Sequence, residues 1–279
     1  MRSLALALLV WGMLCHAASG VMAQEATTPT GAPGKEADSA AHLAKQLSNP
    51  VASLISVPFQ SNWDFGIGPK NATRYTMNLQ PVIPFELGKD WNLITRTIVP
   101  VINQESSAPG LHDEFGFGDV LQSFFFSPRR PVGGWIVGLG PVFAYPTASH
   151  DALGSGKWGA GPTAVLVKQR GPWTVGVLAN HVHSIGGHGN RADVSTTLIQ
   201  PFLTHNWKTG TGVTLNTEST YDWENHQWTV PINLAVSQVL KVGKQPLSVG
   251  LGGRYYAKAP DGGPDWGLRF TVTLMFPKR

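Results

Sequence analysis

The chain has 279 residues, a formal net charge of +4 at neutral pH and only 14% charged residues, against about 25% in an average soluble domain. The positive charges are not clustered, so no nucleic-acid partner is expected. The single cysteine, Cys15, lies close to the amino terminus, which excludes disulfide frameworks and thiolate metal sites from the rest of the chain. No later segment has the unbroken apolar length of a membrane helix.

The first residues have the parts of a secretory signal peptide. Arg2 precedes an apolar run from Leu4 to Leu14, and small residues before Gln24 suit cleavage after Ala23. An uncleaved membrane anchor is the alternative, but the apolar run is shorter than the roughly 20 residues of a spanning helix. We expect residues 1–23 to be removed and the mature protein to leave the cytoplasm.

Residues 24–50 are predicted to form a flexible lead-in with a short helix. The segment 24–41 is rich in Ala, Thr, Gly and Pro and has no periodic apolar residues. Leu43 and Leu47, four residues apart, then predict about two helical turns, which Pro50 ends.

From Val51 onward, twelve segments alternate apolar and polar residues with the two-residue period of a strand. The last segment is the clearest, because its apolar residues alternate with Gly267, Arg269, Thr271 and Thr273: they are Trp266, Leu268, Phe270, Val272, Leu274 and Phe276. A soluble sandwich would turn these apolar sides toward a second sheet. An outer-membrane barrel would turn them toward lipid.

Charged residues are confined to the opposite, inward side of the predicted strands. Placing Arg or Lys on the lipid side costs about 2 to 4 kcal/mol at the bilayer midplane, so this asymmetry favours a barrel in lipid. Residues 51–279 are therefore predicted to be an all-β, closed antiparallel transmembrane barrel of about twelve strands. Asp64 is one inward charge, and the candidates for lining the lumen are Arg96, Asp119, Glu218, Asp222, Arg254 and Arg269.

The connections and the tryptophans agree with this topology. Short breaks alternate with longer ones at 102–117 and 147–157, as periplasmic turns alternate with outer loops in bacterial barrels, and an even strand number leaves both ends in the periplasm. Tryptophan falls near the predicted strand ends, where a membrane interface would lie. The interface candidates are Trp63, Trp91, Trp135, Trp158, Trp173, Trp228 and Trp266.

Prolines inside the predicted strands are the main objection to a closed barrel. Each removes a hydrogen-bond donor from the sheet, so bulges or strand ends are expected at some of them. These residues are Pro81, Pro141, Pro162, Pro201 and Pro231.

Five stretches resemble a known family of outer-membrane proteins: QPVIPF (80–85), DWNLITRTIVPVI (90–102), GFGDVLQSFFFSP (116–128), GSGKWGAGPTAVLVKQ (154–169) and LNTESTYDW (215–223). This is the family associated with the meta-pathway of phenol degradation, labelled also as transporters and misnamed neuromedin U. The resemblance spans roughly Gln46 to Lys278. It implies a small outer-membrane barrel that passes aromatic or other hydrophobic small molecules, and it carries over no catalytic or binding motif.

Three patterns in the sequence are of the kind that occurs in enzyme or metal sites. The glycines from Gly154 to Gly159 match GxGxxG, but a loop entering a strand explains them better than a nucleotide site. His181 and His183 share one side of a strand and are weak zinc candidates, with His188 as a third ligand, although interfacial side chains are the commoner explanation. Ser184 and Ser219 are serines near the outer rim, but His183 and Ser184 would point to opposite sides of a strand, which disfavours a lipase.

The sequence thus predicts a porin-like outer-membrane barrel of a Gram-negative bacterium, with outer-membrane lipid and an unknown small solute as partners, no catalytic residues and no cofactor. Two alternatives stay open. One is a structural or adhesive barrel whose lumen is sealed by side chains or by the segment from His42 to Ser48, and the other is an outer-membrane enzyme of lipase type.

Overall fold

The computed structural model describes residues 33–277, so the predicted signal peptide lies outside the described residues. Within the described residues, one α-helix, α2 (Pro33–Leu47), precedes the strands, and a short 3-10 helix, η1 (Asp151–Leu153), lies in a loop. No helix in residues 33–277 is long and apolar enough to cross a membrane. The strands are β1 (Ile55–Ile67), β2 (Ala72–Leu79), β3 (Val82–Leu87), β4 (Trp91–Gln104), β5 (Glu114–Phe117), β6 (Val120–Pro128), β7 (Ile136–Tyr145), β8 (Lys157–Arg170), β9 (Trp173–Gly187), β10 (Ser195–Asn206), β11 (Thr211–Thr217), β12 (Ser219–Asp222), β13 (Gln227–Val242), β14 (Gln245–Lys258) and β15 (Trp266–Phe276).

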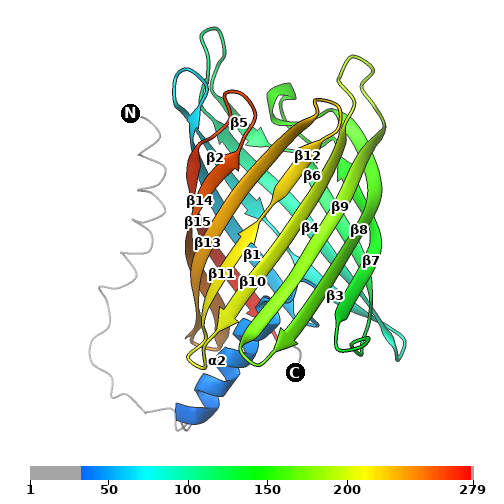
Figure 1. The fold of residues 1–279 in the computed structure, drawn as a ribbon, viewed down its shortest axis with the longest axis vertical. Helices are drawn as coiled ribbons and strands as arrows, with labels where there is room; N and C mark the ends of the chain where they lie inside the picture. The colour runs from blue at the N-terminus through cyan, green and yellow to red at the C-terminus, as the bar shows by residue number, and fades with distance from the viewer. Residues whose placement is uncertain (1–32, 278–279) are drawn as a thin grey trace, which may run out of the picture. The chain divides into compact units, whose positions relative to one another are not determined.

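These segments form one closed antiparallel barrel of 12 strands, as predicted (Figure 1). The barrel closes because β1 pairs with β15 along its length, from Ile55 opposite Phe276 to Phe65 opposite Trp266. The segments outnumber the barrel strands because three strands are each interrupted once, between β2 and β3, β5 and β6, and β11 and β12.

The two ends of the barrel differ in their connections. At one end, which we call the terminal end, β1 begins, β15 finishes, and short turns such as 171–172 and 243–244 join the strands. At the other, the loop end, connections 105–113 and 146–156 are longer (Figure 1). Bacterial barrels place short turns in the periplasm and long loops outside, so the terminal end corresponds to the periplasmic side.

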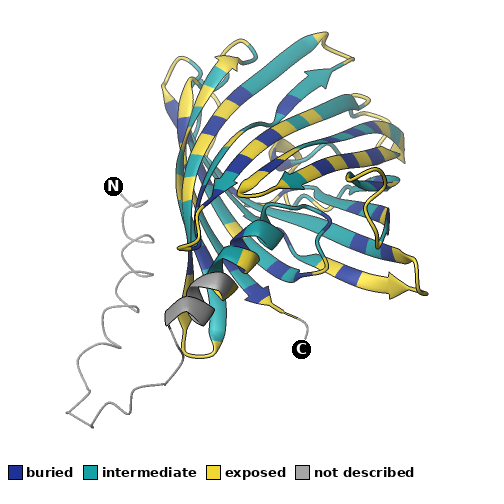
Figure 2. Cartoon of the chain, turned by 60° about the horizontal axis from the view of Figure 1, so that its bottom comes forward, coloured by how far each residue is buried: buried dark blue, intermediate teal, exposed yellow. Residues whose placement is uncertain are grey.

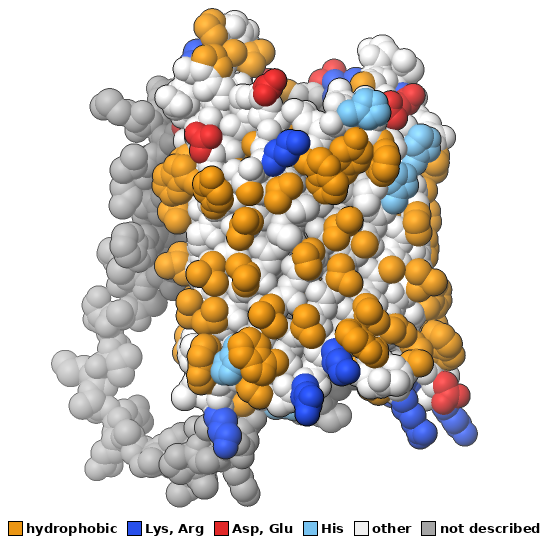
Figure 3. Space-filling view, in the orientation of Figure 1, with side chains coloured by type: hydrophobic (Ala, Val, Ile, Leu, Met, Phe, Trp, Pro, Cys, Tyr) orange, Lys and Arg blue, Asp and Glu red, His pale blue; other side chains and the backbone are white. Residues whose placement is uncertain are grey.

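The outer surface of the barrel wall is apolar. Burial alternates along the strands, with exposed residues on the outside and buried residues facing the lumen (Figure 2). On the face seen in Figure 3, hydrophobic side chains occupy a broad band, and charged side chains gather toward its two edges. Exposed residues of this kind include Phe59, Phe126, Leu139, Leu166, Leu203, Leu234, Leu251, Tyr255, Leu268 and Phe270.

The in-strand prolines are accommodated in two ways. Pro81 lies in the break between β2 and β3, and Pro231 lies at a register shift between β13 and β14, as expected for residues without an N–H donor. Pro141 and Pro162 instead lie opposite each other in continuous strands, as Pro201 lies opposite Val177.

Helix α2 is longer than predicted, because it begins at Pro33, within the segment expected to be flexible. It ends at Leu47, before Pro50, as predicted. Leu43 and Ala44 of the helix are buried with Leu54 and with Val239 and Met275 of the barrel. The sequence of α2 favours this longer helix, since Pro33 is its first residue and Ala, Leu, Lys, Glu and Gln make up most of the rest. Packing of its apolar side against the barrel adds to that preference.

Candidate functional site

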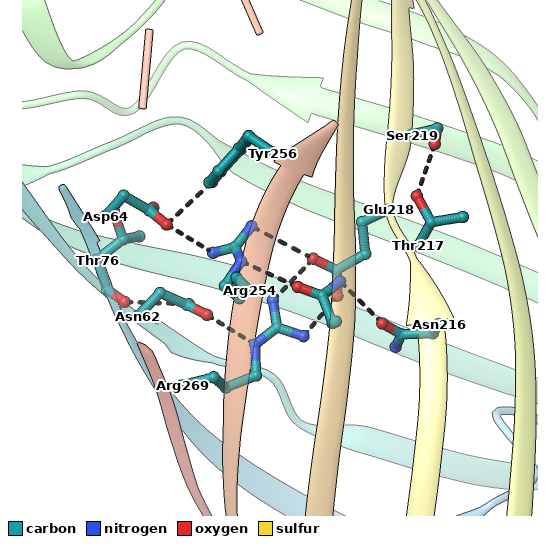
Figure 4. A network of polar contacts seen from close by, with 11 residues as sticks. Asn62, Asp64, Thr76, Asn216, Thr217, Glu218, Ser219, Arg254, Tyr256 and Arg269 are labelled. Atoms are coloured by element: carbon teal, nitrogen blue, oxygen red, sulfur yellow. Dashed lines mark hydrogen bonds and ion pairs between the residues drawn. The ribbon is translucent and has the colours of Figure 1, made fainter. Parts of the chain in front are cut away.

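Four ionised side chains from neighbouring strands form a network on the inner side of the wall, which we call the charged layer: Asp64, Glu218, Arg254 and Arg269 (Figure 4). Arg269 donates two parallel hydrogen bonds to Glu218, from Nη1 to Oε1 at 2.9 Å and from Nη2 to Oε2 at 2.8 Å. Arg254 lies between the two carboxylates, with its Nη1 at 3.3 Å from Asp64 Oδ1 and its Nη2 at 3.8 Å from Glu218 Oε2. The paired fork geometry is the strongest form of arginine–carboxylate contact.

Neutral side chains complete the hydrogen bonding of the charged layer. Arg269 Nε donates to Asn62 Oδ1 at 2.7 Å, and Arg254 Nε donates to Asn233 Oδ1 at 3.1 Å. Tyr256 Oη donates to Asp64 Oδ1 at 2.9 Å. The side chains of Arg254 and Arg269 are each only 10% exposed, so these contacts replace water for both cations.

Strand register brings Asp64 and Arg254 together although a strand separates them. Asp64 lies opposite Gly267 of β15, and Gly267 lies opposite Arg254 of β14. A Cβ atom at Gly267 would lie 2.6 Å from Asp64 Oδ1, so only glycine leaves room for the two side chains to meet above β15. Glu218 occupies the break between β11 and β12.

Two further arginines lie on either side of the charged layer without a carboxylate partner. Arg96 of β4 donates to the neutral Gln80 Oε1 at 2.8 Å and lines a cavity toward the terminal end. Arg74 of β2 lies opposite Asp64 in the sheet and lines a cavity toward the loop end. Within residues 33–277, the Arg74 guanidinium makes no hydrogen bond or ion pair.

The two cavities lie inside the barrel. The cavity toward the terminal end, which we call the lower cavity, has a volume of about 290 Å³. It is bounded by residues 44–54 and by small polar side chains of the wall, among them Thr214, Ser237, Ser248, Thr271 and Thr273. The cavity toward the loop end, which we call the upper cavity, has a volume of about 410 Å³. It is bounded by the charged layer and by Asn62, Arg74, Thr76, Tyr256, Pro260 and Pro264. Both volumes are comparable with those of small-ligand sites, which run from about 300 to 1,000 Å³.

The segment after α2 covers the terminal end of the lumen. Val51 is buried among inward apolar side chains of the opposite wall: Ile94, Phe125, Val165, Val167, Leu178 and Phe202. Gln169 Nε2 donates to the Lys45 carbonyl at 2.8 Å, and Asn206 Nδ2 donates to Ser48 Oγ at 2.9 Å. Figure 2, with this end turned forward, shows the end of α2 at the mouth of the barrel.

The structure brings together four of the six candidates for lining the lumen: Arg96, Glu218, Arg254 and Arg269. Asp119 instead lies in the break between β5 and β6, where it accepts hydrogen bonds from the backbone N–H groups of Ala148 and Ser155. It therefore fixes the loop 146–156. Asp222 ends β12 and accepts hydrogen bonds from the backbone of Glu224 and Asn225, so it shapes an outer turn.

Arg74 and Asn62 are not among the candidates that the sequence predicts, although the alternation places both on the inward side. Arg74 has the same parity as Thr76 and Asn78, which the pattern placed inward, and Asn62 has the parity of Asp64. Their importance depends on the neighbours they meet across strands, which the sequence alone does not give.

The residues considered for metal or enzyme chemistry are dispersed. His181 Nδ1 lies 2.9 Å from Thr197 Oγ1, and His183 is exposed. Ser184 Oγ donates to Asp193 at 3.2 Å, and Ser219 Oγ lies 2.6 Å from Thr217 Oγ1. In the part of the chain that the structure describes, no three His, Cys, Asp or Glu side chains are grouped to hold a metal ion.

Tryptophans lie near both ends of the barrel wall. Trp91, Trp173 and Trp266 are the first residues of their strands, and each is about half exposed. Several pack against other rings, as Trp63 does with Tyr75 at 5.1 Å and Trp158 with Tyr145 at 5.6 Å between centroids. The other interface candidates are Trp228, the second residue of β13, and Trp135, over whose ring Lys168 lies at 5.0 Å.

Among solved structures, the fold is similar to that of an outer membrane channel from Pseudomonas putida F1, with a TM-score of 0.61, 16% identity, and coverage of 80% of this chain and 94% of that chain. The chain has the fold of an outer-membrane β-barrel. A weaker likeness, with a TM-score of 0.46, 14% identity and coverage of 87% and 98%, is to outer membrane phospholipase A from Escherichia coli. No protein-family model and no curated protein sequence matches the chain, so the phenol-degradation family stays a prediction.

Proposed function

We propose that this protein is a passive outer-membrane channel for small molecules with an aromatic or other hydrophobic body. The observation that carries the proposal is that one side of the lumen is unfilled. Between the charged layer and the terminal end, most inward positions of β11 and β13 to β15 that border the lower cavity are small and polar, and the apolar Val239 lies only at the margin covered by α2. A barrel built only for rigidity would gain stability by filling such space with larger side chains.

The outer surface supports a place in the outer membrane. Its exposed side chains are apolar over a broad band, and tryptophans lie toward both ends of the barrel, where aromatic residues favour a membrane–water interface. The predicted signal peptide would direct the chain out of the cytoplasm. The partner of the outer surface in this proposal is lipid.

Passage requires the segment from Leu43 to Leu54 to move aside at the terminal end. Few hydrogen bonds hold it to the barrel, and its apolar contacts form two small clusters, one around Val51 and one of Leu43, Ala44 and Leu54 with Val239 and Met275. Small clusters of this kind can open locally without unfolding of the barrel. Solutes would then pass along the side of the lumen that carries small polar residues, on β11 and β13 to β15. The charged layer narrows this passage toward the loop end.

A cross-linking experiment tests this proposal directly. In a Cys15→Ser background without other cysteines, Ser48→Cys and Asn206→Cys replace the pair whose side chains now meet at 2.9 Å. The protein is placed in lipid vesicles, and swelling in arabinose and ionic conductance are measured. A short reducible thiol cross-linker should abolish both, and reduction should restore them. Unchanged flux after complete cross-linking would refute the moving segment.

A sealed structural barrel is the second candidate, and the same segment favours it. Val51, Leu43 and Leu54 are all buried within the barrel, as a permanent cover would be. In that case the vesicles would show neither swelling nor conductance in the cross-linked, reduced or unmodified protein, while the barrel still inserted correctly.

An enzymatic role is not part of the proposal. His183 and Ser184 lie on a strand with different surroundings, one exposed and one hydrogen-bonded to Asp193, and this is not the arrangement of a nucleophile with its base. Release of fatty acid from phospholipid vesicles by the purified protein, lost in Ser184→Ala, would overturn this part of the proposal.

A further inference from the structure

The upper cavity carries more positive than negative charge. Three arginines line it, Arg74, Arg254 and Arg269, against two carboxylates, Asp64 and Glu218, which leaves a formal charge of 3 − 2 = +1. Arg96, beneath the charged layer, adds a further positive charge, which is near Glu218 but hydrogen-bonded only to the neutral Gln80 among the described side chains. Charges in a narrow passage with low-dielectric walls raise the local concentration of mobile ions of opposite sign.

The positive charge in the upper cavity that has no paired carboxylate is that of Arg74. Glu218 is engaged by both Arg269 and Arg254, and Asp64 is engaged by Arg254 and by the Tyr256 hydroxyl group. Arg74 is close enough to Asp64 to interact with its charge, yet no described residue accepts a hydrogen bond from its guanidinium group. Because Arg74 lines the cavity, its guanidinium donors are available to a molecule bound there.

The walls around Arg74 are of mixed polarity. Thr76 and Asn78 follow it along β2 on the lumen side, and Gln104 lies opposite it on β4. Toward the loop end the same cavity is bounded by apolar groups, namely Ile67, the ring of Tyr256, Pro260 and Pro264. A ligand with one charged end and an apolar body would satisfy both parts of this wall.

We infer that the upper cavity binds small organic anions, specifically monocarboxylates with an aromatic or short aliphatic body, through the guanidinium group of Arg74. The planar fork of arginine matches the two oxygens of a carboxylate, and the cavity of about 410 Å³ accommodates a body of that size. This inference rests on the proposed channel and names its solute class: the site holds the carboxylate above the charged layer before the solute passes.

Binding to the purified full-length protein in detergent tests the site without any need for flux. Benzoate is titrated by calorimetry, with benzamide as a neutral molecule of nearly the same shape. Benzoate should bind at least about tenfold more tightly, because its two charged oxygens can form a paired ion contact with Arg74, whereas benzamide offers one neutral oxygen. Equal affinity for the two probes would overturn the inference.

Two variants each remove the excess positive charge of the site by a different route. Arg74→Gln removes the cation, and Gln104→Glu supplies a carboxylate from the residue opposite it, so both should lose the preference for benzoate. Arg170→Gln, the same change at an exposed position at the end of β8, should leave it intact. If either Arg74→Gln or Gln104→Glu folds, shown by heat-dependent migration in SDS, and still prefers benzoate, the assignment to Arg74 is wrong.

Vesicle swelling separates this inference from the proposed function. Arg74→Gln should still pass arabinose, because the small polar side of the lumen is unchanged. Benzoate binding without arabinose flux in any form of the protein would refute the channel and leave the anion site standing. Arabinose flux without a preference for benzoate would refute the anion site and leave the channel standing.

Discussion

On the side of the lumen formed by β4 to β10, inward positions near the terminal end carry apolar side chains that pack around Val51. On the side formed by β1 and β11 to β15, most inward residues are small, polar or charged, and only Val239 and Met275 pack against α2. Phe125 and Ile94 on the first side are fully buried. On the second side, Ser237, Ser248 and Thr271 border open space. One alternation of outward and inward residues therefore supports a packed core on one side and a passage on the other.

The difference shows that the inward side of a small barrel is not a uniform wet surface. Apolar side chains that cannot face lipid and cannot face a second sheet pack against a segment of the chain that enters the barrel. Polar side chains that cannot pack in this way form a hydrogen-bonded network instead.

The largest expected effect comes from breaking the charged layer. Arg269→Met removes the paired hydrogen bonds of Glu218, which is partly buried and keeps only its longer contact with Arg254. Removing one partner of a buried ion pair costs about 3–5 kcal/mol, and the loss here should be near the lower end of that range. Urea unfolding of the barrel in lipid vesicles measures this cost. Arg129→Met is the matched control, because the Arg129–Glu86 pair is exposed and such pairs contribute only about 0–1 kcal/mol. Similar losses for both variants would mean that the layer is well hydrated.

The outward and inward sides of β15 can be distinguished by arginine substitution. Val272 lies between Phe59 and Val249 on the outer side of the wall, whereas Thr271 borders the lower cavity. Val272→Arg should cost about 2–4 kcal/mol in folding free energy and impair membrane assembly, because the charge meets lipid. Thr271→Arg should assemble with a much smaller loss. Heat-dependent migration in SDS measures assembly, and urea titration measures the folding free energy. Equal tolerance of arginine at both positions would show that the outward and inward sides of β15 are wrongly assigned.

The packed side can be opened without unfolding the barrel. Val51→Asp places a charge among Ile94, Phe125 and Val167, and a buried unpaired charge is costly enough for the segment to leave its position. Conductance should rise severalfold while the urea midpoint of the barrel changes little. Ser53→Asp, two residues away at an exposed position, should change neither quantity. A Val51→Asp protein with unchanged conductance would contradict the covering role of the segment.

The smallest effect is expected at an ion pair outside the lumen. Hydrogen bonds from Lys157 Nζ and Ser184 Oγ lower the pKa of the Asp193 carboxyl group below its ordinary value of 3.8. Because the folded-state pKa is lowered, the resulting stability is present above the ordinary value and is lost as the pH falls through the lowered one. The small difference in urea midpoint between the protein and Asp193→Asn should therefore be present at neutral pH and disappear in strong acid. A difference that persists in acid would exclude this origin.

Much of the barrel follows from the sequence alone, because a strand facing lipid must exclude charge at every second position. The alternation from Trp266 to Phe276 determines which side of β15 is outward, and the same rule counts the twelve strands and places Glu218, Arg254 and Arg269 inside. Local patterns are sufficient here because the lipid acts on each strand separately.

The site needed the tertiary structure, because its contacts join strands that are distant along the chain. Asp64 meets Arg254 only through the closure of β1 on β15 and the absence of a side chain at Gly267, and neither follows from local periodicity. Asp222 and Arg74 both have inward parity, yet one ends a strand in an outer turn and the other lies beside a cavity. The sequence by itself determined the barrel and its two sides, whereas only barrel closure and strand register decided which inward charges pair, which one stays available, and which apolar residues pack around Val51.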